Sequence, residues 1–205
     1  MAISVPVQQV NLRYLIDNFG LQRVRDPKFF EEWQTDLPEL TEMETLQLDR
    51  IRESYFNLVD HPPVLENVVK LTIISPLLFV AGFYLSPFHI KCEKSIEITD
   101  EDEGIKINGR INILVLKNNL WVTVIESKQL DFSLEKGLAQ ILTYMLADPH
   151  KNTPTFGLIT NGVNFSFIKL VREGNPKYAL SDEFVIRNQA NELYKILKIL
   201  KRLSA

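Results

Sequence analysis

The hydrophobic period of this chain changes at Phe88, and that change constrains the fold more than any other feature. Before Phe88, apolar residues recur at helical spacing; after it, apolar and polar residues alternate, which is typical of half-buried strands. Three successive strands are therefore expected, over 88–98, 105–116 and 121–128, with a helix beginning at Ser133. In the second strand, one face should carry Ile105, Ile107, Gly109, Ile111, Ile113 and Val115, with Asn112 on the other face.

The segments on either side of these strands complete the expected order of elements. The first sixty residues read as helical, with a helix start at Asp26-Pro27 and a capping box from Thr41 to Glu44. A further helix is expected from Val64 to about Phe83, kinked at Pro76. After the central helix we expect a hairpin with a type I′ turn at Asn161-Gly162 and a strand near 178–186. The final helix should bury Leu193, Ile196, Leu197, Leu200 and Leu203.

Length and composition favour a single α/β domain. The chain has 205 residues, of which 45% are hydrophobic, enough for one full-sized core. We expect a mixed β-sheet flanked by helices, with residues 1–62 as a helical N-terminal extension and 63–205 as the core. The single cysteine, Cys92, rules out an internal disulfide framework, and the start of the chain does not resemble a secretory signal, so the expected location is the cytoplasm.

Two further classes of function are disfavoured by composition. No apolar stretch reaches the roughly 20 residues of a membrane-spanning helix, so no membrane association is expected. The net charge of -3 means that overall electrostatics will not draw the chain onto DNA. Any contact with nucleic acid must therefore use local patches of charge.

The sharpest local feature is Glu126-Ser127-Lys128 at the end of the third strand. The period of two places Glu126 and Lys128 on one face, where a carboxylate can hold Mg²⁺ and an ammonium can position a water or offset phosphate charge. This is an outline of phosphodiester chemistry. An ordinary exposed charged pair is the alternative, and on spacing alone it is the more common case.

The order of motifs around this pair resembles the PD-(D/E)xK nucleases, especially the restriction-endonuclease-like group related to the nuclease domain of type I restriction R subunits. Gly109-Arg110-Ile111-Asn112 is similar to that group's glycine-x-x-aspartate step, with Glu126-Ser127-Lys128 in the place of its E-x-K. Gln140 and Tyr144 resemble the QxxxY motif of RecB-like members, and Thr160-Asn161-Gly162 resembles the hairpin that follows it.

The resemblance implies a restriction-endonuclease-like core and a site for Mg²⁺, with Mn²⁺ as a substitute. By it, the metal ligands would be Glu126 and Asn112. The Ser127 carbonyl and Glu93, on the polar face of the first strand, are further candidate ligands. Lys128 would orient the attacking water, while Gln140, Tyr144 and Arg110 would contact DNA or buttress the site. A homodimer, or association with restriction-system subunits, is also implied.

The chain departs from the family pattern at Asn112, where the family has an aspartate. An amide oxygen is a neutral and weaker ligand for Mg²⁺ than a carboxylate. Two interpretations follow: a Mg²⁺-dependent nuclease that acts on DNA, or a catalytically degenerate member that binds DNA or a protein.

The positions of these residues also predict an irregularity in the sheet. A regular two-residue turn at Asn118-Asn119 would pair Asn112 with Ile125 and leave Glu126 on the opposite face. A common face for Asn112 and Glu126 requires one extra residue. We therefore expect a bulge or a longer loop between Leu116 and Glu126.

Overall fold

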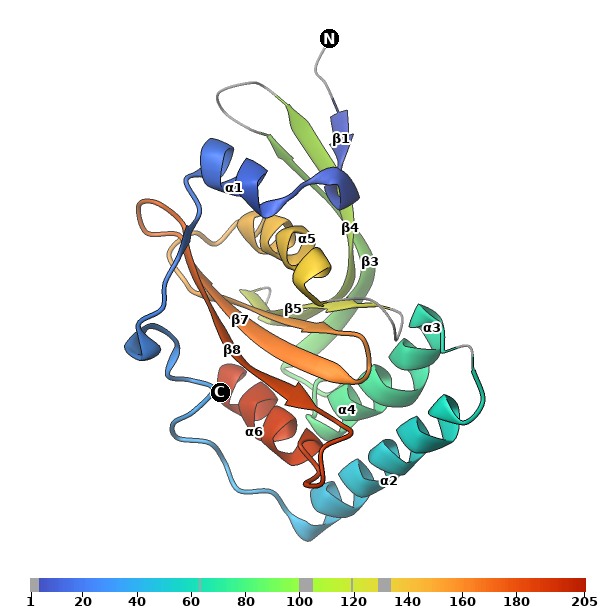
Figure 1. Cartoon of the computed structure of the whole chain (residues 1–205). Coiled ribbons are helices and arrows are strands. Elements are labelled where there is room, and N and C mark those ends of the chain that lie inside the picture. Colours follow the sequence, from blue (N-terminus) through green and yellow to red (C-terminus); the bar gives the residue numbers. More distant parts are fainter. Residues whose placement is uncertain (1–3, 63, 100–104, 119, 129–133) are drawn as a thin grey trace.

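A computed structural model describes residues 4–62, 64–99, 105–118, 120–128 and 134–205 of the chain. These residues form an α/β fold built on a mixed eight-stranded sheet with helices on both faces (Figure 1). The strands are β1 (Ser4–Pro6), β2 (Gln22–Arg23), β3 (Phe88–Thr99), β4 (Lys106–Lys117), β5 (Leu120–Ser127), β6 (Thr155–Thr160), β7 (Asn164–Val171) and β8 (Lys177–Val185).

The sheet follows the order β1-β4-β5-β6-β7-β8-β2, and β3 pairs with β4 beside this path. Three pairs are parallel, namely β1 with β4, β5 with β6 and β2 with β8. The other pairs are antiparallel. The parallel pair β5 and β6 is joined through helix α5 (Leu134–Leu146), which gives a βαβ unit at the centre of the sheet.

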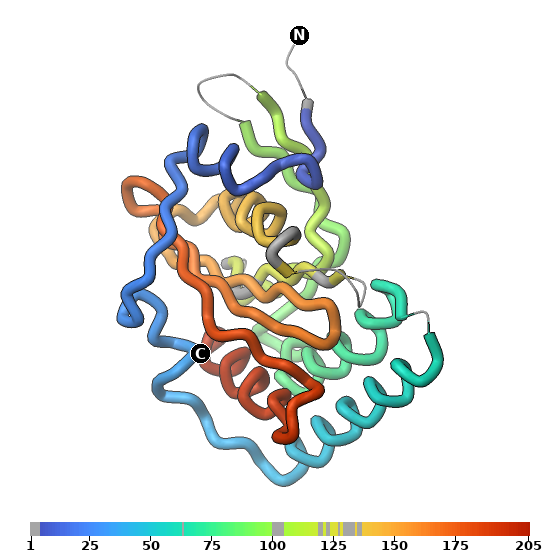
Figure 2. The backbone as a smooth tube through the Cα atoms, in the orientation of Figure 1, coloured from blue at the N-terminus to red at the C-terminus, as the bar shows by residue number. Residues whose placement is uncertain are grey.

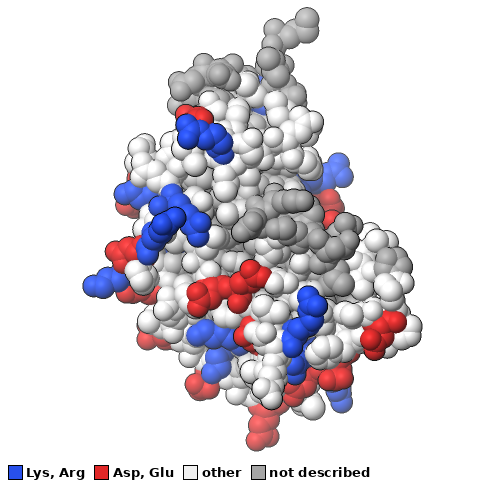
Figure 3. Space-filling view, in the orientation of Figure 1, with Lys and Arg blue, Asp and Glu red and all other residues white. Residues whose placement is uncertain are grey.

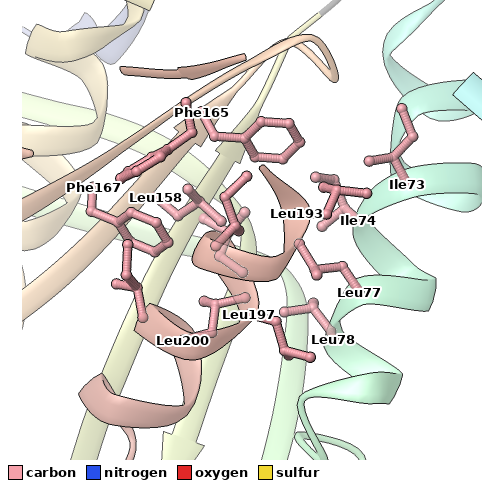
Figure 4. Packing of buried hydrophobic residues seen from close by; sticks show 14 of the residues in the cluster. Ile73, Ile74, Leu77, Leu78, Leu158, Phe165, Phe167, Leu193, Leu197 and Leu200 are labelled. Atoms are coloured by element: carbon pink, nitrogen blue, oxygen red, sulfur yellow. The ribbon is translucent and has the colours of Figure 1, made fainter. Parts of the chain in front are cut away.

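Two hydrophobic cores lie on opposite faces of the sheet. Helix α5 and helix α1 (Leu12–Phe19) cover one face. The other face is covered by α2 (Glu42–Val59), α3 (Glu66–Val69), α4 (Ser75–Val80) and α6 (Leu193–Leu203). Figure 4 shows Leu197 and Leu200 of α6 between the aromatic side chains of β7 and the leucines of α4. All five apolar positions expected to be buried in the last helix are buried, which confirms that expectation.

The helical regions of the first half agree with the sequence in outline. The capping box is present, with the Thr41 side chain accepting from Glu44 N and the Glu44 carboxylate accepting from Thr41 N. Asp26 caps a 3₁₀ turn over Pro27–Phe30 in place of a longer helix. The expected helix over 64–83 is α3, a π-helical turn (Lys70–Ile74) and α4, so the irregular turn lies just before Pro76. Ser133 lies outside the described residues.

The first sixty residues are not helical throughout. Strand β1 pairs with Lys106–Asn108 of β4, beyond the stretch of β4 that pairs with β5, and β2 pairs with Lys177–Tyr178 of β8 at the far end of the sheet. Between α1 and α2 the chain follows one side of the molecule past β8 (Figure 2). The N-terminal extension is thus built into the sheet as well as packed on it, because unpaired strand edges accept short added strands.

The side chains of β4 do not keep to one face, and the expectation that they would is wrong for its second half. Ile107 and Ile111 pack on the α5 face, whereas Ile113 and Val115 pack in the opposite core. The alternation changes phase at Asn112. Its neighbour on β3 is Glu93, which adopts a left-handed backbone conformation with φ of 52°. A residue in that region interrupts the regular pleat, so β3 and β4 serve both cores.

The hairpin between β6 and β7 differs from the expected type I′ turn. Three residues separate the strands, and Gly162 has a positive φ of 86°. Asn161 instead accepts hydrogen bonds from the backbone N of Val163 and of Asn164 through its side-chain Oδ1. This local side-chain bond replaces the mirror-image turn that the Asn-Gly pair suggested.

Within the described ranges, no helix combines the length and the apolar character that crossing a bilayer demands.

The core against α6 gives a direct test of the fold. Leu200→Ala should lower the free energy of unfolding by about 2–5 kcal/mol, because Leu200 is fully buried. Leu71→Ala is the matched control, since Leu71 is 72% exposed, and should change stability by less than about 0.5 kcal/mol. Urea unfolding followed by circular dichroism measures both. Equal effects for the two variants would contradict this packing.

Candidate active site

The backbone places Glu126 and Lys128 at the end of β5. Glu126 pairs with Ile159 of β6, and Lys128 N donates to Thr160 O at 2.8 Å, so the parallel pairing continues past the strand end. Val124 packs in the core beneath α5, and Ile125 packs in the opposite core. Alternation therefore directs Glu126 toward α5.

The irregularity expected between Leu116 and Glu126 is present. Leu116 pairs with Trp121, but Val115 pairs with Thr123, so β5 carries one extra residue between these pairs. After the bulge, Ile113 pairs with Ile125. Continuing that register by one step brings Asn112 beside Glu126, which a regular ladder from the turn would not do.

Four side chains from β5 and α5 form one hydrogen-bonded cluster. Lys128 Nζ donates to Glu126 Oε1 at 2.6 Å and to Gln140 Oε1 at 2.8 Å. Gln140 Nε2 lies 2.6 Å from Glu126 Oε1 and 2.7 Å from the Tyr144 hydroxyl. The helical spacing of Gln140 and Tyr144 puts both on the face of α5 that meets the end of β5. The structure thus brings together the E-x-K pair and the Q-x-x-x-Y pair.

The Glu126 carboxylate is only 1% exposed, and its two oxygens differ in environment. Oε1 accepts from both Lys128 and Gln140, whereas Oε2 is buried and has no hydrogen-bond partner among the described residues. Burial raises the pKa of Glu126 from 4.5 to about 7, although the charge and hydrogen bond of Lys128 oppose the rise. A buried, unpaired carboxylate oxygen calls for a water or a cation as its partner.

Tyr144 is held from three sides. Burial, with the nearby negative charge of Glu126, raises the pKa of the Tyr144 phenol, so the group stays protonated and can donate. The backbone of Arg110 also hydrogen-bonds this hydroxyl. A Cβ on Gly109 would lie 2.7 Å from Tyr144 Cε1 and 2.8 Å from Val7 Cγ1. Gly109 is therefore required for the close approach of β4, the tyrosine ring and the N-terminal segment.

Asn112 lies between two glutamates in the sheet. The flanking pairs of β3 and β4, Cys92 with Ile113 and Lys94 with Ile111, bracket Glu93 and Asn112. The register on the other side of β4 leads to Glu126. An amide between two carboxylates avoids the like-charge repulsion that a third acid would add.

The structure adds two residues that the sequence reasoning did not assign. Glu66 and Lys70, one turn apart on the helix before β3, form an ion pair of 2.7 Å. Lys70 Nζ also lies 3.5 Å from Glu93 Oε1. Charges on Glu66 and Lys70 both act on Glu126. The four-residue spacing of Glu66 and Lys70 predicts an ion pair on a helix. Such pairs are common on any helix, so the spacing does not point to a functional site.

Two other proposed site residues, Arg110 and Ser127, have no described side chain in this cluster. Gly109 and Ile111 face α5, so alternation places the exposed Arg110 side chain on the other face of β4. Ser127 pairs with Thr160 in the sheet, and its side chain is outside the described part.

The donor atoms around Glu126 fit a weakly held hard cation. Among the described residues, no three His, Cys, Asp or Glu side chains converge as a ready-made metal site. The Glu126 oxygen that lacks a hydrogen-bond partner within the described ranges, with Asn112 and Glu93 as neighbours along the sheet, offers oxygen donors of the kind that Mg²⁺ prefers. Mg²⁺ is commonly bound by one or two carboxylates together with waters and substrate phosphates.

No protein-family model matches this chain, and no curated protein matches it at a significant level.

The raised pKa of Glu126 predicts a specific dependence of stability on pH. The pKa of Glu126 is about 7 in the folded chain, against the ordinary value of 4.5, so the folded state binds more protons between these pH values and stability falls as pH rises through them. Because this change corresponds to about 3 kcal/mol, Glu126→Gln should gain up to that amount relative to wild type between pH 4.5 and pH 8.

Urea unfolding of both proteins across this pH range measures the difference. Asp182→Asn, at an acid on β8 far along the sheet from β5, is the control and should show no such trend. A constant difference between Glu126→Gln and wild type at all pH values would contradict the raised pKa.

Proposed function

We propose that the chain is a Mg²⁺-dependent nuclease that hydrolyses DNA phosphodiester bonds and has a restriction-endonuclease-like core. One observation carries the proposal: the buried Glu126 carboxylate has one oxygen bonded to Lys128 and a second oxygen that no group in the described part of the chain hydrogen-bonds. This places a cation-binding oxygen beside an ammonium group. A cation that polarises the phosphoryl group and a positive charge that offsets phosphate charge are both suited to phosphodiester hydrolysis.

The arrangement of the strands also supports a restriction-endonuclease-like core. An antiparallel pair, β4 and β5, is followed by a helix and a parallel strand, β6, and then by a hairpin to β7. Asn112, Glu126, Lys128, Gln140 and Tyr144 lie on this unit in the order that the motifs of the family suggest.

In this proposal each side chain has a separate task. Glu126 and Asn112 hold the cation, with Glu93 close enough to contribute a carboxylate. When bound, Mg²⁺ polarises a phosphoryl oxygen and lowers the pKa of a bound water. The Lys128 ammonium orients the attacking water and offsets phosphate charge. Gln140 fixes Lys128 and Glu126 relative to each other, and Tyr144 fixes Gln140.

Contact with DNA in this proposal is local. On the face in Figure 3, positive and negative side chains are interspersed over the residues described there. The side chain of Lys128 is 13% exposed, so an approaching phosphate can reach it. Few phosphate contacts give a shallow dependence of binding on salt.

A second candidate is a degenerate member that binds DNA or a protein, such as a restriction-system subunit or a second copy of this chain. The neutral Asn112 and the direct ion pair between Lys128 and Glu126 favour it, because both reduce the charge available to a metal. Cleavage of DNA is expected of the first candidate and not of the second.

Cleavage of supercoiled and linear DNA with Mg²⁺ or Mn²⁺ separates them. We expect wild type to cut and Lys128→Ala to lose at least about 100-fold in rate, because water positioning and charge stabilisation each contribute that much or more. Lys177→Ala, an exposed lysine on β8, is the matched control and should cut like wild type.

An Asn112→Asp variant decides the remaining cases. If wild type is inert and Asn112→Asp cuts, the site is degenerate and binding becomes the function. If wild type and both site variants leave DNA and RNA intact, catalysis is rejected and a protein partner should be sought.

A further inference from the structure

Two lysines of strand β3 lie on the same face of the sheet as the candidate active site. Lys91 pairs with Leu114 of β4. Lys94 pairs with Ile111 of the same strand, and both partners pack in the core beneath α5. Side chains directly opposite each other on neighbouring strands lie on one face. Lys91 and Lys94 therefore point to the side of the sheet that carries α5 and the Glu126 carboxylate.

The irregular backbone at Glu93 is what places both lysines on this face. In a regular strand, residues three positions apart point to opposite faces of the sheet. Cys92 still follows the regular alternation, because it pairs with Ile113 of the opposite core. Glu93, which comes next, has a φ of 52°, and the phase of the alternation changes there. Such conformations are rare for residues other than glycine and are frequent at ligand sites.

The charges on β3 leave these two lysines available to an anion. Both acidic residues of the strand are already paired, since Glu93 Oε1 lies 3.5 Å from Lys70 Nζ and Glu97 Oε1 lies 2.9 Å from a lysine of β4. Neither Lys91 nor Lys94 forms an ion pair with another described residue. Lys91 is exposed and Lys94 is half-buried, so an anion can reach both from solvent.

The two lysines extend the candidate active site toward the edge of the sheet. Asn112 lies between the β4 partners of Lys91 and Lys94, and the register on its other side leads to Glu126. Only β4 separates β3 from β5, so the lysines arise about 10 Å from the strand that carries Lys128. That span matches about three nucleotides of one DNA strand.

We propose that Lys91 and Lys94 bind phosphates of the DNA strand that reacts at Lys128, and that this strand runs from the end of β5 across β4 to β3. The inference rests on the proposed function for the choice of DNA as the partner. It adds the path of the substrate and two residues that hold it. Each ammonium group acts as a point charge on a phosphate, so the contacts position DNA without reading its sequence.

Lysines on an edge strand also have a purely structural use, because their charge keeps the edge from pairing with another chain. That use does not require the two side chains to share a face. A regular strand would place one lysine on each face and would protect the edge as well. The break in the pleat at Glu93 and the pairing of both β3 acids with other lysines favour an anionic partner on the α5 side.

Binding of a short fluorescent DNA duplex to the full-length protein tests this inference. Fluorescence anisotropy without divalent cations measures binding in the absence of cleavage. The double variant Lys91→Gln/Lys94→Gln should bind at least about tenfold more weakly than wild type, because each lost contact is a hydrogen bond between charged groups. The slope of log affinity against log salt should become shallower by up to about 2, since each phosphate contact contributes about 0.9.

The double variant Lys151→Gln/Lys177→Gln is the matched control. It also removes two exposed lysines, one shortly before β6 and one at the first residue of β8. Strands β5, β6 and β8 run in the same direction, so these lysines lie at the opposite end of the sheet from Lys128. Because charges farther away than about 10 Å are screened at 0.1 M salt, the affinity should change by less than about twofold.

The outcomes separate this inference from the nuclease proposal. Weaker binding with a shallower slope in Lys91→Gln/Lys94→Gln supports the inference even if wild type binds DNA without cutting it, which overturns only the nuclease proposal. Unchanged binding, or a loss no larger than that of the control, overturns the inference even if wild type cuts DNA. Absence of DNA binding by wild type also overturns it.

A charge-conserving variant separates the loss of charge from a disturbed strand. Lys91→Arg/Lys94→Arg keeps both positive charges and should bind DNA within about twofold of wild type, because the phosphate contacts are mainly electrostatic. Weak binding by this variant, equal to that of the glutamine variant, would overturn the inference. Size-exclusion chromatography and circular dichroism confirm that each variant is folded and has not associated through the edge of β3.

Discussion

The buried carboxylate of Glu126 is the interaction around which the centre of this molecule is arranged. A charge in a low-dielectric interior is strongly unfavourable unless it is paired and hydrogen-bonded. Lys128 and Gln140 both bond the same oxygen, and they arrive from the strand end and from helix α5. The junction of β5 and α5 is therefore fixed by polar contacts, while apolar packing on both sides keeps water away.

Three departures from regular backbone geometry lie around this carboxylate. The bulge between β4 and β5 shifts the register, the left-handed Glu93 changes the phase of β3 and β4, and the π-helical turn begins at Lys70. The bulge brings Asn112 into register with Glu126, and the other two departures lie at Glu93 and Lys70, which form an ion pair of 3.5 Å. Irregularities of this kind are stable only where the surrounding structure determines them, and here two well-packed cores do so.

The N-terminal segment also supports the site. Val7 packs close to Gly109, at the point where Tyr144 passes over β4. Strand β1 pairs with β4 beyond the end of the β4–β5 ladder, and β2 pairs with β8 at the far edge of the sheet. The N-terminal segment thus pairs with the stretch of β4 beyond β5 and with the edge strand β8, and Val7 packs where the Tyr144 ring meets Gly109.

The sequence by itself determined several helices and strands and the contact between Glu126 and Lys128. The period of apolar residues fixed the three central strands and the buried face of α6, and the Glu-x-Lys spacing agreed with the contact between Glu126 and Lys128. The bulge was also predictable, because a two-residue turn at Asn118-Asn119 would put Asn112 and Glu126 on opposite faces of the sheet. These features depend on residues near one another in the chain, where propensity and periodicity act.

Only the tertiary structure decided the features that depend on distant partners. The phase change at Asn112 needs two cores on opposite faces, and the strands β1 and β2 need sheet edges supplied by residues more than 100 positions away. The ion pair of Lys70 with Glu93 joins a helical turn to strand β3, although helix α4 lies between them in the chain. The local pattern of apolar residues predicts which side chains are buried. It does not predict which distant residues they pack against. Pairing register and long-range charge contacts are therefore set when the chain folds.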